Sequence, residues 1–232
     1  MKKTMFALAA VAMLAAPVVS HAQAAATKPG VGVLPFASAS IDPNLAPLGK
    51  GIPAIMINEL SRNTSIRVVE REAIQQILDE QKLGTSGNLD PATVIKVGKL
   101  IGAHYMITGS FVTDPAKNMQ LTVRCFNVET SEIIYSETVK GKTDGLIDLI
   151  QQAGAKTSAG LKLPPIPASA KGEAELGAAQ TKKMPLATAM LYARAIEAED
   201  SGKKAEAKQL YSQVQSSFPY PPAKAAIDRL NK

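Results

Sequence analysis

The chain has 232 residues, of which 46% are hydrophobic and 20% are charged, and its formal net charge is +6. These proportions are ordinary for a folded protein of one or two domains. Its one cysteine, Cys125, excludes an internal disulfide and a metal site built from several cysteines. A modest positive charge spread along the chain argues against a nucleic-acid partner.

The N-terminal segment has the pattern of a secretory signal peptide. Two lysines precede an apolar run from Met5 to Ala16, and small-residue cleavage sites follow at Ala22 and Ala24. We expect residues 1–24 to be removed on export, because a membrane anchor, the alternative interpretation, needs about 20 apolar residues. No cysteine lies near these sites to accept a lipid. The sequence therefore predicts a soluble, unlipidated periplasmic protein of a two-membrane bacterium, with no transmembrane segment after cleavage.

Residues 30–161 are expected to form an α/β domain, which begins with two strands and three helices. The short apolar run Val31–Phe36 predicts a buried strand, and the apolar residues of Leu48–Leu60 recur at helical spacing. A second strand, Ile66–Val69, leads at Glu70-Arg71 into the next helix. Asp90-Pro91 then has the pattern of a helix start, an N-cap followed by proline.

The rest of this domain changes to the period of two that is typical of strands. Tyr105–Val112, Leu121–Val128 and Ile133–Val139 predict three successive strands, the last two joined as a hairpin. Thr143 or Asp144 could cap a closing helix. The resulting order, β-α-β-α-α-β-β-β-α, predicts a mixed sheet flanked by helices.

Several segments of this domain carry a family resemblance. They are GVGVLPF, the stretch IRVVEREAIQQILDEQKLG, the strand LIGAHYMITGSF and the hairpin FNVETSEII. In this order they resemble the periplasmic domain of the curli secretion channel (CsgG) family. A second, weaker likeness is to the peptidoglycan-synthase activator lipoproteins. The first resemblance implies an envelope protein, and the second implies a regulator of a cell-wall synthase as an alternative.

The chain departs from the CsgG family where that family inserts its membrane-barrel hairpins. Those hairpins follow the third and the fifth strands, and each needs about 20 residues plus a turn to cross a bilayer. Here only Thr113–Asn118 and Val139–Thr143 stand at these places. We therefore expect a protein that is not itself a pore.

The C-terminal third is expected to contain a connector and a small helical module. Residues 162–185 are rich in proline, alanine and lysine and predict a linker rather than core. In residues 186–232 two helices joined at Gly202 have the spacing of a tetratricopeptide repeat. Such a module could bind a partner or another copy of the chain, or it could be a helical hairpin docked on the α/β domain. The candidate partner contacts are Tyr192, Lys208 and Tyr211, the first two expected to be exposed.

No catalytic, cofactor-binding or metal-binding residue is predicted. His104 has no second histidine or cysteine with which to bind a metal, and we expect it to be structural. Glu70 and Arg71 are expected to cap a helix and to form salt bridges. Cys125 alternates in phase with apolar neighbours, so a buried, inert thiol is expected over a reactive one.

The sequence therefore predicts a binding protein and not an enzyme. Our first hypothesis is an accessory in outer-membrane or surface-fibre (curli-like) assembly or secretion, acting on envelope proteins or as a homo-oligomer. The alternative is a regulator of a peptidoglycan synthase. An envelope enzyme is a remote third hypothesis, because no catalytic constellation is present.

Overall fold

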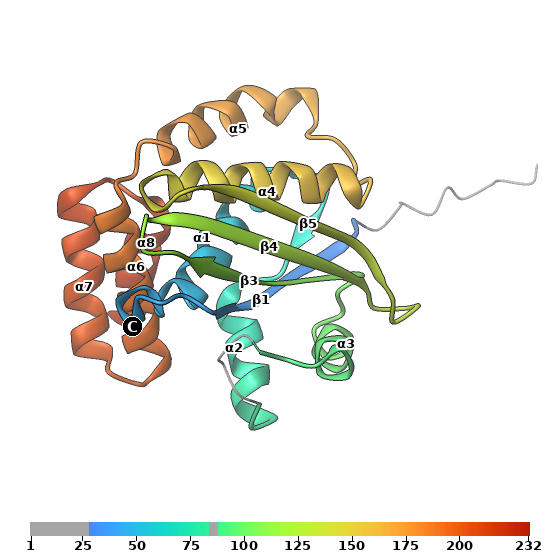
Figure 1. Cartoon of the computed structure of the whole chain (residues 1–232), viewed down its shortest axis with the longest axis horizontal. Helices are drawn as coiled ribbons and strands as arrows, with labels where there is room; N and C mark the ends of the chain where they lie inside the picture. The colour runs from blue at the N-terminus through green and yellow to red at the C-terminus, as the bar shows by residue number, and fades with distance from the viewer. Residues whose placement is uncertain (1–27, 84–87) are drawn as a thin grey trace, which may run out of the picture.

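A five-stranded mixed sheet lies at the centre of the computed structural model, which describes residues 28–83 and 88–232 (Figure 1). The strand order is β2-β1-β3-β4-β5. Strand β1 pairs in parallel with β2 and β3, whereas β3, β4 and β5 are antiparallel neighbours. The strands are β1 (Gly30–Ser38), β2 (Arg67–Val68), β3 (Tyr105–Thr113), β4 (Asn118–Asn127) and β5 (Ile133–Lys142). The predicted α/β class is confirmed, and the predicted signal peptide lies outside the described residues.

Helices cover both faces of the sheet. On one face lie α1 (Leu48–Ser61) and α4 (Leu146–Gly160), and on the other lie α2 (Arg71–Glu80) and α3 (Pro91–Leu100). Successive residues of a strand point to opposite faces. Accordingly, Ile107 of β3 belongs to the core under α1 and α4, and its neighbour Met106 belongs to the core under α2 and α3.

The predicted helix start at Asp90-Pro91 is confirmed, but the one at Thr143 or Asp144 is wrong. Asp90 accepts a 3.0 Å hydrogen bond from the Thr93 amide, as an N-cap should. In contrast, a short 3-10 turn (η2, Thr143–Gly145) precedes α4, and Gly145 is the residue at its N-cap. The Thr143 amide donates to the Lys117 carbonyl at 3.0 Å, which keeps Thr143 tied to the preceding turn.

A helix, α5 (Ala168–Thr181), lies inside the segment predicted as a linker. It runs across the outside of α4 (Figure 1). Alanine, glutamate and lysine are strong helix formers, so the segment becomes helical once its prolines end. Only Ala174 and Thr181 of α5 are buried, so the sequence has no apolar stripe that would have predicted this helix.

The C-terminal residues form three helices that pack on the α/β domain. They are α6 (Leu186–Asp200), α7 (Lys204–Ser217) and α8 (Pro221–Leu230), all at one end of the sheet (Figure 1). Gly202 joins α6 to α7 with a left-handed φ of +74°. Helix α6 lies so close to α1 that a Cβ on Gly51 would come within 2.6 Å of the Ala193 Cβ. The docked arrangement considered from the sequence is therefore the one observed.

Within residues 28–83 and 88–232, no helix is both long and apolar enough to span a membrane. The division of the chain into an α/β domain, a linker and a tetratricopeptide-like module stays a prediction.

Candidate functional site

An ion cluster joins the start of α2 to the end of α6. The Arg71 guanidinium donates to Asp200 at 2.5 Å and to Glu199 at 3.1 Å, and Lys50 donates to Asp200 at 2.7 Å. The Asp200 side chain is only 4% exposed. The salt-bridging role expected for Arg71 is confirmed, with partners that lie more than a hundred residues further along the chain. The capping role expected for Glu70 is wrong, because its exposed side chain makes no cap hydrogen bond.

The same cluster extends through Glu199 to the last two helices. Glu199 accepts a 2.7 Å hydrogen bond from the Tyr211 hydroxyl and a 2.7 Å bond from the Arg229 guanidinium. Although burial opposes the charge on Arg71, the Asp200 carboxylate raises the pKa of that guanidinium above its ordinary value. For Tyr211, burial acts in the other direction and raises the pKa, so the hydroxyl stays protonated and acts as a donor. The cluster therefore fixes α2, α6, α7 and α8 relative to one another.

The structure separates the three predicted partner contacts by exposure. Lys208 is exposed, but Tyr211 and Tyr192 are 1% and 6% exposed. The expectation that Tyr192 is exposed is wrong, because its ring packs edge-on against the Tyr220 ring, with 5.0 Å between the ring centroids, and at a tilt against the Tyr211 ring, with 5.8 Å between them. These aromatic contacts hold α6, α7 and the start of α8 together. A partner-binding role for the three residues stays a prediction.

A hollow of about 240 Å³ lies beside the ion cluster. Its walls come from α1, the start of α2, and the C-terminal helices, and include Glu70, Arg71, Tyr192, Tyr211 and Arg229. The fold thus brings the Val-Glu-Arg strand end together with the tyrosines of the helical hairpin. The contact between these two segments could not be predicted from the sequence, because they are far apart in the chain.

The remaining candidates for chemistry have structural surroundings. His104 accepts a 2.9 Å hydrogen bond at Nδ1 from the Gly30 amide, which fixes the entry to β1 beside the entry to β3. Burial raises the pKa of Cys125 to about 12, so its thiol stays protonated and inert. The expected burial of Cys125 is confirmed, and the structural role expected for His104 stays a prediction.

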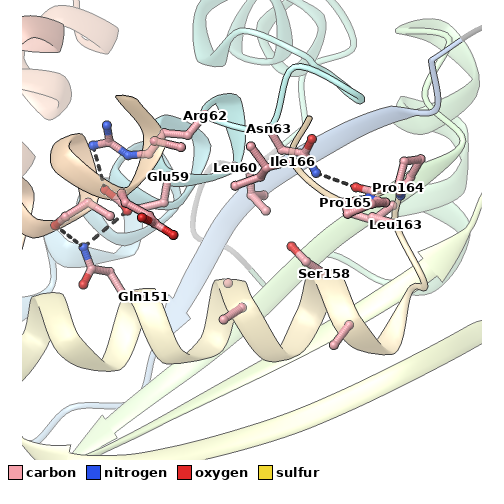
Figure 2. A pocket seen from close by; sticks show the side chains of 16 residues that line it. Glu59, Leu60, Arg62, Asn63, Gln151, Ser158, Leu163, Pro164, Pro165 and Ile166 are labelled. Carbon is pink, nitrogen blue, oxygen red and sulfur yellow. Dashed lines mark hydrogen bonds and ion pairs between the residues drawn. The ribbon is translucent and has the colours of Figure 1, made fainter. Parts of the chain in front are cut away.

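A second, larger hollow of about 460 Å³ lies between α1, α4, α5 and the segment 163–166 (Figure 2). Glu59, Arg62 and Gln151 stand at one end, and Asn63 faces Pro164 near the other (Figure 2). The sequence did not predict this hollow, because it exists only when 168–181 is a helix. The sequence feature that could have indicated this hollow is the high share of small residues in segments 153–160 and 168–179.

The fold is an α/β domain with a docked helical extension. The family model described as "Curli production assembly/transport component CsgG" matches residues 14–114. This stretch is less than half of the chain and includes β1, β2, β3 and the helices between them. The resemblance predicted from the sequence is thereby confirmed. No curated protein matches the chain.

Several solved structures are similar over part of their fold. The LpoB C-terminal domain from Salmonella enterica is 16% identical, with 52% of this chain and 87% of that chain covered and a TM-score of 0.42. Lipoprotein GNA1162 from Neisseria meningitidis is 14% identical over 56% of this chain and 96% of that chain, with a TM-score of 0.43. A PelC dodecamer from Paraburkholderia phytofirmans is 16% identical over 60% and 90%, with a TM-score of 0.36. At these scores none of the likenesses bears on the function of this chain.

Proposed function

We propose that this chain is an accessory binding protein of the bacterial envelope that assists assembly or secretion at the outer membrane. The observation that carries the proposal is the match of residues 14–114 to a family described as a curli production assembly and transport component. The matched residues include strands β1 to β3 of the sheet and helices α1 to α3. The protein would act by holding other proteins, or further copies of itself, and not by catalysis.

The place of action that fits this function is the periplasm. The N-terminal pattern of two lysines, an apolar run and small-residue sites supports export and cleavage. The one cysteine, Cys125, lies on β4 in the core and is not available to carry a lipid. The processed protein would then be free in the periplasm and would reach its partners by diffusion.

A role beside a channel, and not as the channel, agrees with the connections between strands. The turn from β3 to β4 spans only residues 114–117 and is closed by hydrogen bonds from the Asn118 amide to the Asp114 side chain and from Lys117 to Asp114. Strand β5 passes directly into η2 and α4. Both connections are far shorter than the roughly 20 residues that a membrane-crossing hairpin requires.

The surface that we assign to partners is the outer side of the C-terminal helices. Lys208 lies there among exposed polar residues of α7. Tyr192 and Tyr211 would support this surface from beneath by fixing the helices, because both rings are buried. The ion cluster at Arg71 would keep the surface in a constant orientation relative to the sheet.

The test is the absolute mass of the processed chain, purified from the periplasm of a two-membrane bacterium and measured by light scattering over a concentration series. We expect a fixed multiple of the monomer mass, or a complex of constant composition with one co-purifying envelope protein. A monomer at every concentration that co-purifies with nothing would overturn the proposal. The full chain is needed, because deleting α6 would uncover the apolar face of α1.

A further inference from the structure

A hollow of about 470 Å³, here called the strand-end hollow, lies outside the carboxyl ends of β1 and β3. These two parallel strands end together, since Ser38 pairs with Phe111 and the Ala39 amide donates to the Phe111 carbonyl at 2.9 Å. The chain then diverges, because β1 leads through α1 to β2 on one side and β3 turns to β4 on the other. In open α/β sheets, ligands bind in the crevice at such a point.

The lining of the strand-end hollow combines apolar side chains with exposed carboxylates. Leu45 and Leu186 are half-buried and pack against the core under α1 and α4. The charged residues of the lining are three exposed aspartates and one exposed lysine, namely Asp42, Asp114, Asp144 and Lys117. Three carboxylates against one ammonium group make the lining acidic, although the chain as a whole has a formal net charge of +6.

The three carboxylates differ in how far the protein itself already uses them. Asp42 accepts a 2.9 Å hydrogen bond from the Asn44 amide, and Asp114 accepts a 2.6 Å bond from the Asn118 side chain. The bond from Asn118 lowers the pKa of Asp114, so this carboxyl group stays ionised. Asp144 has no hydrogen-bond or ion-pair partner within the described parts of the chain, and it is therefore the carboxylate most available to a ligand.

A buried hydroxyl without a partner also lines the strand-end hollow. Thr143 is only 5% exposed, and its hydroxyl makes no hydrogen bond with any residue that the structure describes. Unlike the buried Thr157 hydroxyl, it is not sealed from solvent. Thr143 continues the row of Val139 on the α1 and α4 side of the sheet, which is also the side of Leu186. An unmet buried hydroxyl is costly, so a ligand group that bonds to it is favoured.

The chemistry of the lining selects an organic cation with several ammonium groups. No set of three or more metal-binding side chains occurs in residues 28–83 and 88–232, so the three carboxylates do not converge on one ion. Aromatic faces, which hold quaternary ammonium groups, are also missing from the described lining. Primary ammonium groups fit, because each can donate to a carboxylate or to the Thr143 hydroxyl. Methylene groups between them would cover Leu45 and Leu186.

We propose that the strand-end hollow binds an aliphatic polyamine. One ammonium group donates to the Thr143 hydroxyl, the others pair with Asp144 and the remaining aspartates, and the methylene chain lies against the two leucines. The site is separate from the partner surface on α7 and from the ion cluster, and it does not depend on the proposed function.

The experiment is calorimetric titration of the processed full chain with spermidine at low ionic strength. We expect saturable one-to-one binding, with 1-aminobutane weaker by about tenfold or more because it has a single ammonium group. Magnesium chloride at the same concentration should not displace spermidine. Absence of saturable binding, equal binding of 1-aminobutane or displacement by magnesium would overturn the proposal. Tighter binding of a trilysine peptide would also overturn it and would assign the hollow to a basic protein segment.

Three variants test the location. Thr143→Val removes the hydroxyl and keeps the shape, so we expect binding to weaken by about fivefold and the melting temperature to stay the same or rise. Asp144→Asn should weaken binding by about threefold or more. Asp79→Asn makes the same change of charge on the exposed side of α2 and should leave binding unchanged. Undiminished binding by the first two variants, or an equal loss in Asp79→Asn, would contradict the proposal.

Discussion

Among single residues, Arg71 has the most demanding environment. Its side chain is 15% exposed and faces Asp200, which is 4% exposed. Removal of Arg71 would leave the buried Asp200 with Lys50 as its one remaining cation among the described residues. Loss of one partner of a buried pair costs more than the pair itself contributes. The predicted salt bridge at Arg71 was correct in kind, but its partners could not be read from the sequence because the fold brings them from α6.

We expect Arg71→Ala to lower the free energy of unfolding by about 3 kcal/mol. Arg229→Ala is the matched control, since Arg229 contacts Glu199 from a side chain that is 41% exposed. Its loss should stay below about 1 kcal/mol, as for surface ion pairs. Urea unfolding of the two variants measures both values, and equal losses would show that burial of the pair does not matter.

The burial of Cys125 makes the free energy of unfolding depend on pH, and it sets the sign of that dependence. The folded thiol has a pKa of about 12, above the ordinary value of an unfolded cysteine. The unfolded chain therefore loses this proton first, and the contribution of Cys125 to stability is complete below about pH 8.5 and is lost between there and pH 12.

The comparison of wild type with Cys125→Ala isolates this effect from the buried tyrosines, which both proteins share. Between pH 9 and 10.5 the wild-type free energy of unfolding should fall faster than that of the variant, by about 1.4 kcal/mol per pH unit. Chemical unfolding at several pH values measures the two slopes. Identical slopes would mean that the thiol is not shielded in the folded protein.

Among the elements, the contact between α1 and α6 decides whether the C-terminal helices belong to the same folded body. Gly51 permits that contact, because a Cβ there would come within 2.6 Å of the Ala193 Cβ. Gly172, in the exposed α5, has open space around it. Alanine is a better helix former than glycine by up to about 1 kcal/mol, so the two substitutions should have opposite signs.

We expect Gly51→Ala to lower the melting temperature, because overpacking of a close helix contact costs about 1 to 3 kcal/mol. Gly172→Ala should keep or raise it. Differential scanning calorimetry of both variants measures the two melting temperatures. A stabilised Gly51→Ala protein would indicate that α6 is not held against α1 in solution.

The elements also show how far sequence reasoning reached. Strands β3 to β5 and helices α1 to α4 follow periods of two or 3.6, and β1 is a continuous apolar run, so the types and order of these elements were predicted correctly. Helix α5 was not, because it buries only Ala174 and Thr181 and so has no apolar stripe. Because α5 forms one wall of the larger hollow, that hollow was not predicted either. Tyr192 was misplaced for a related reason, because its partner Tyr220 comes from the start of a different helix.

At the scale of the whole molecule, the chain combines a scaffold with a rigidly attached helical end. The ion cluster, the tyrosine contacts and the close α1–α6 packing all fix that end relative to the sheet. A fixed, polar outer surface suits a protein that aligns partners. We therefore expect specific partner contacts that involve α7 and not the opposite side of the molecule.

The most direct measurement is site-specific photo-crosslinking in growing cells, with the reactive residue at position 208 on α7 or at the exposed position 96 on α3. We expect discrete adducts, with another copy of the chain or with one envelope protein, from position 208 and few from position 96. A chain that stays at monomer mass from position 208 would contradict it.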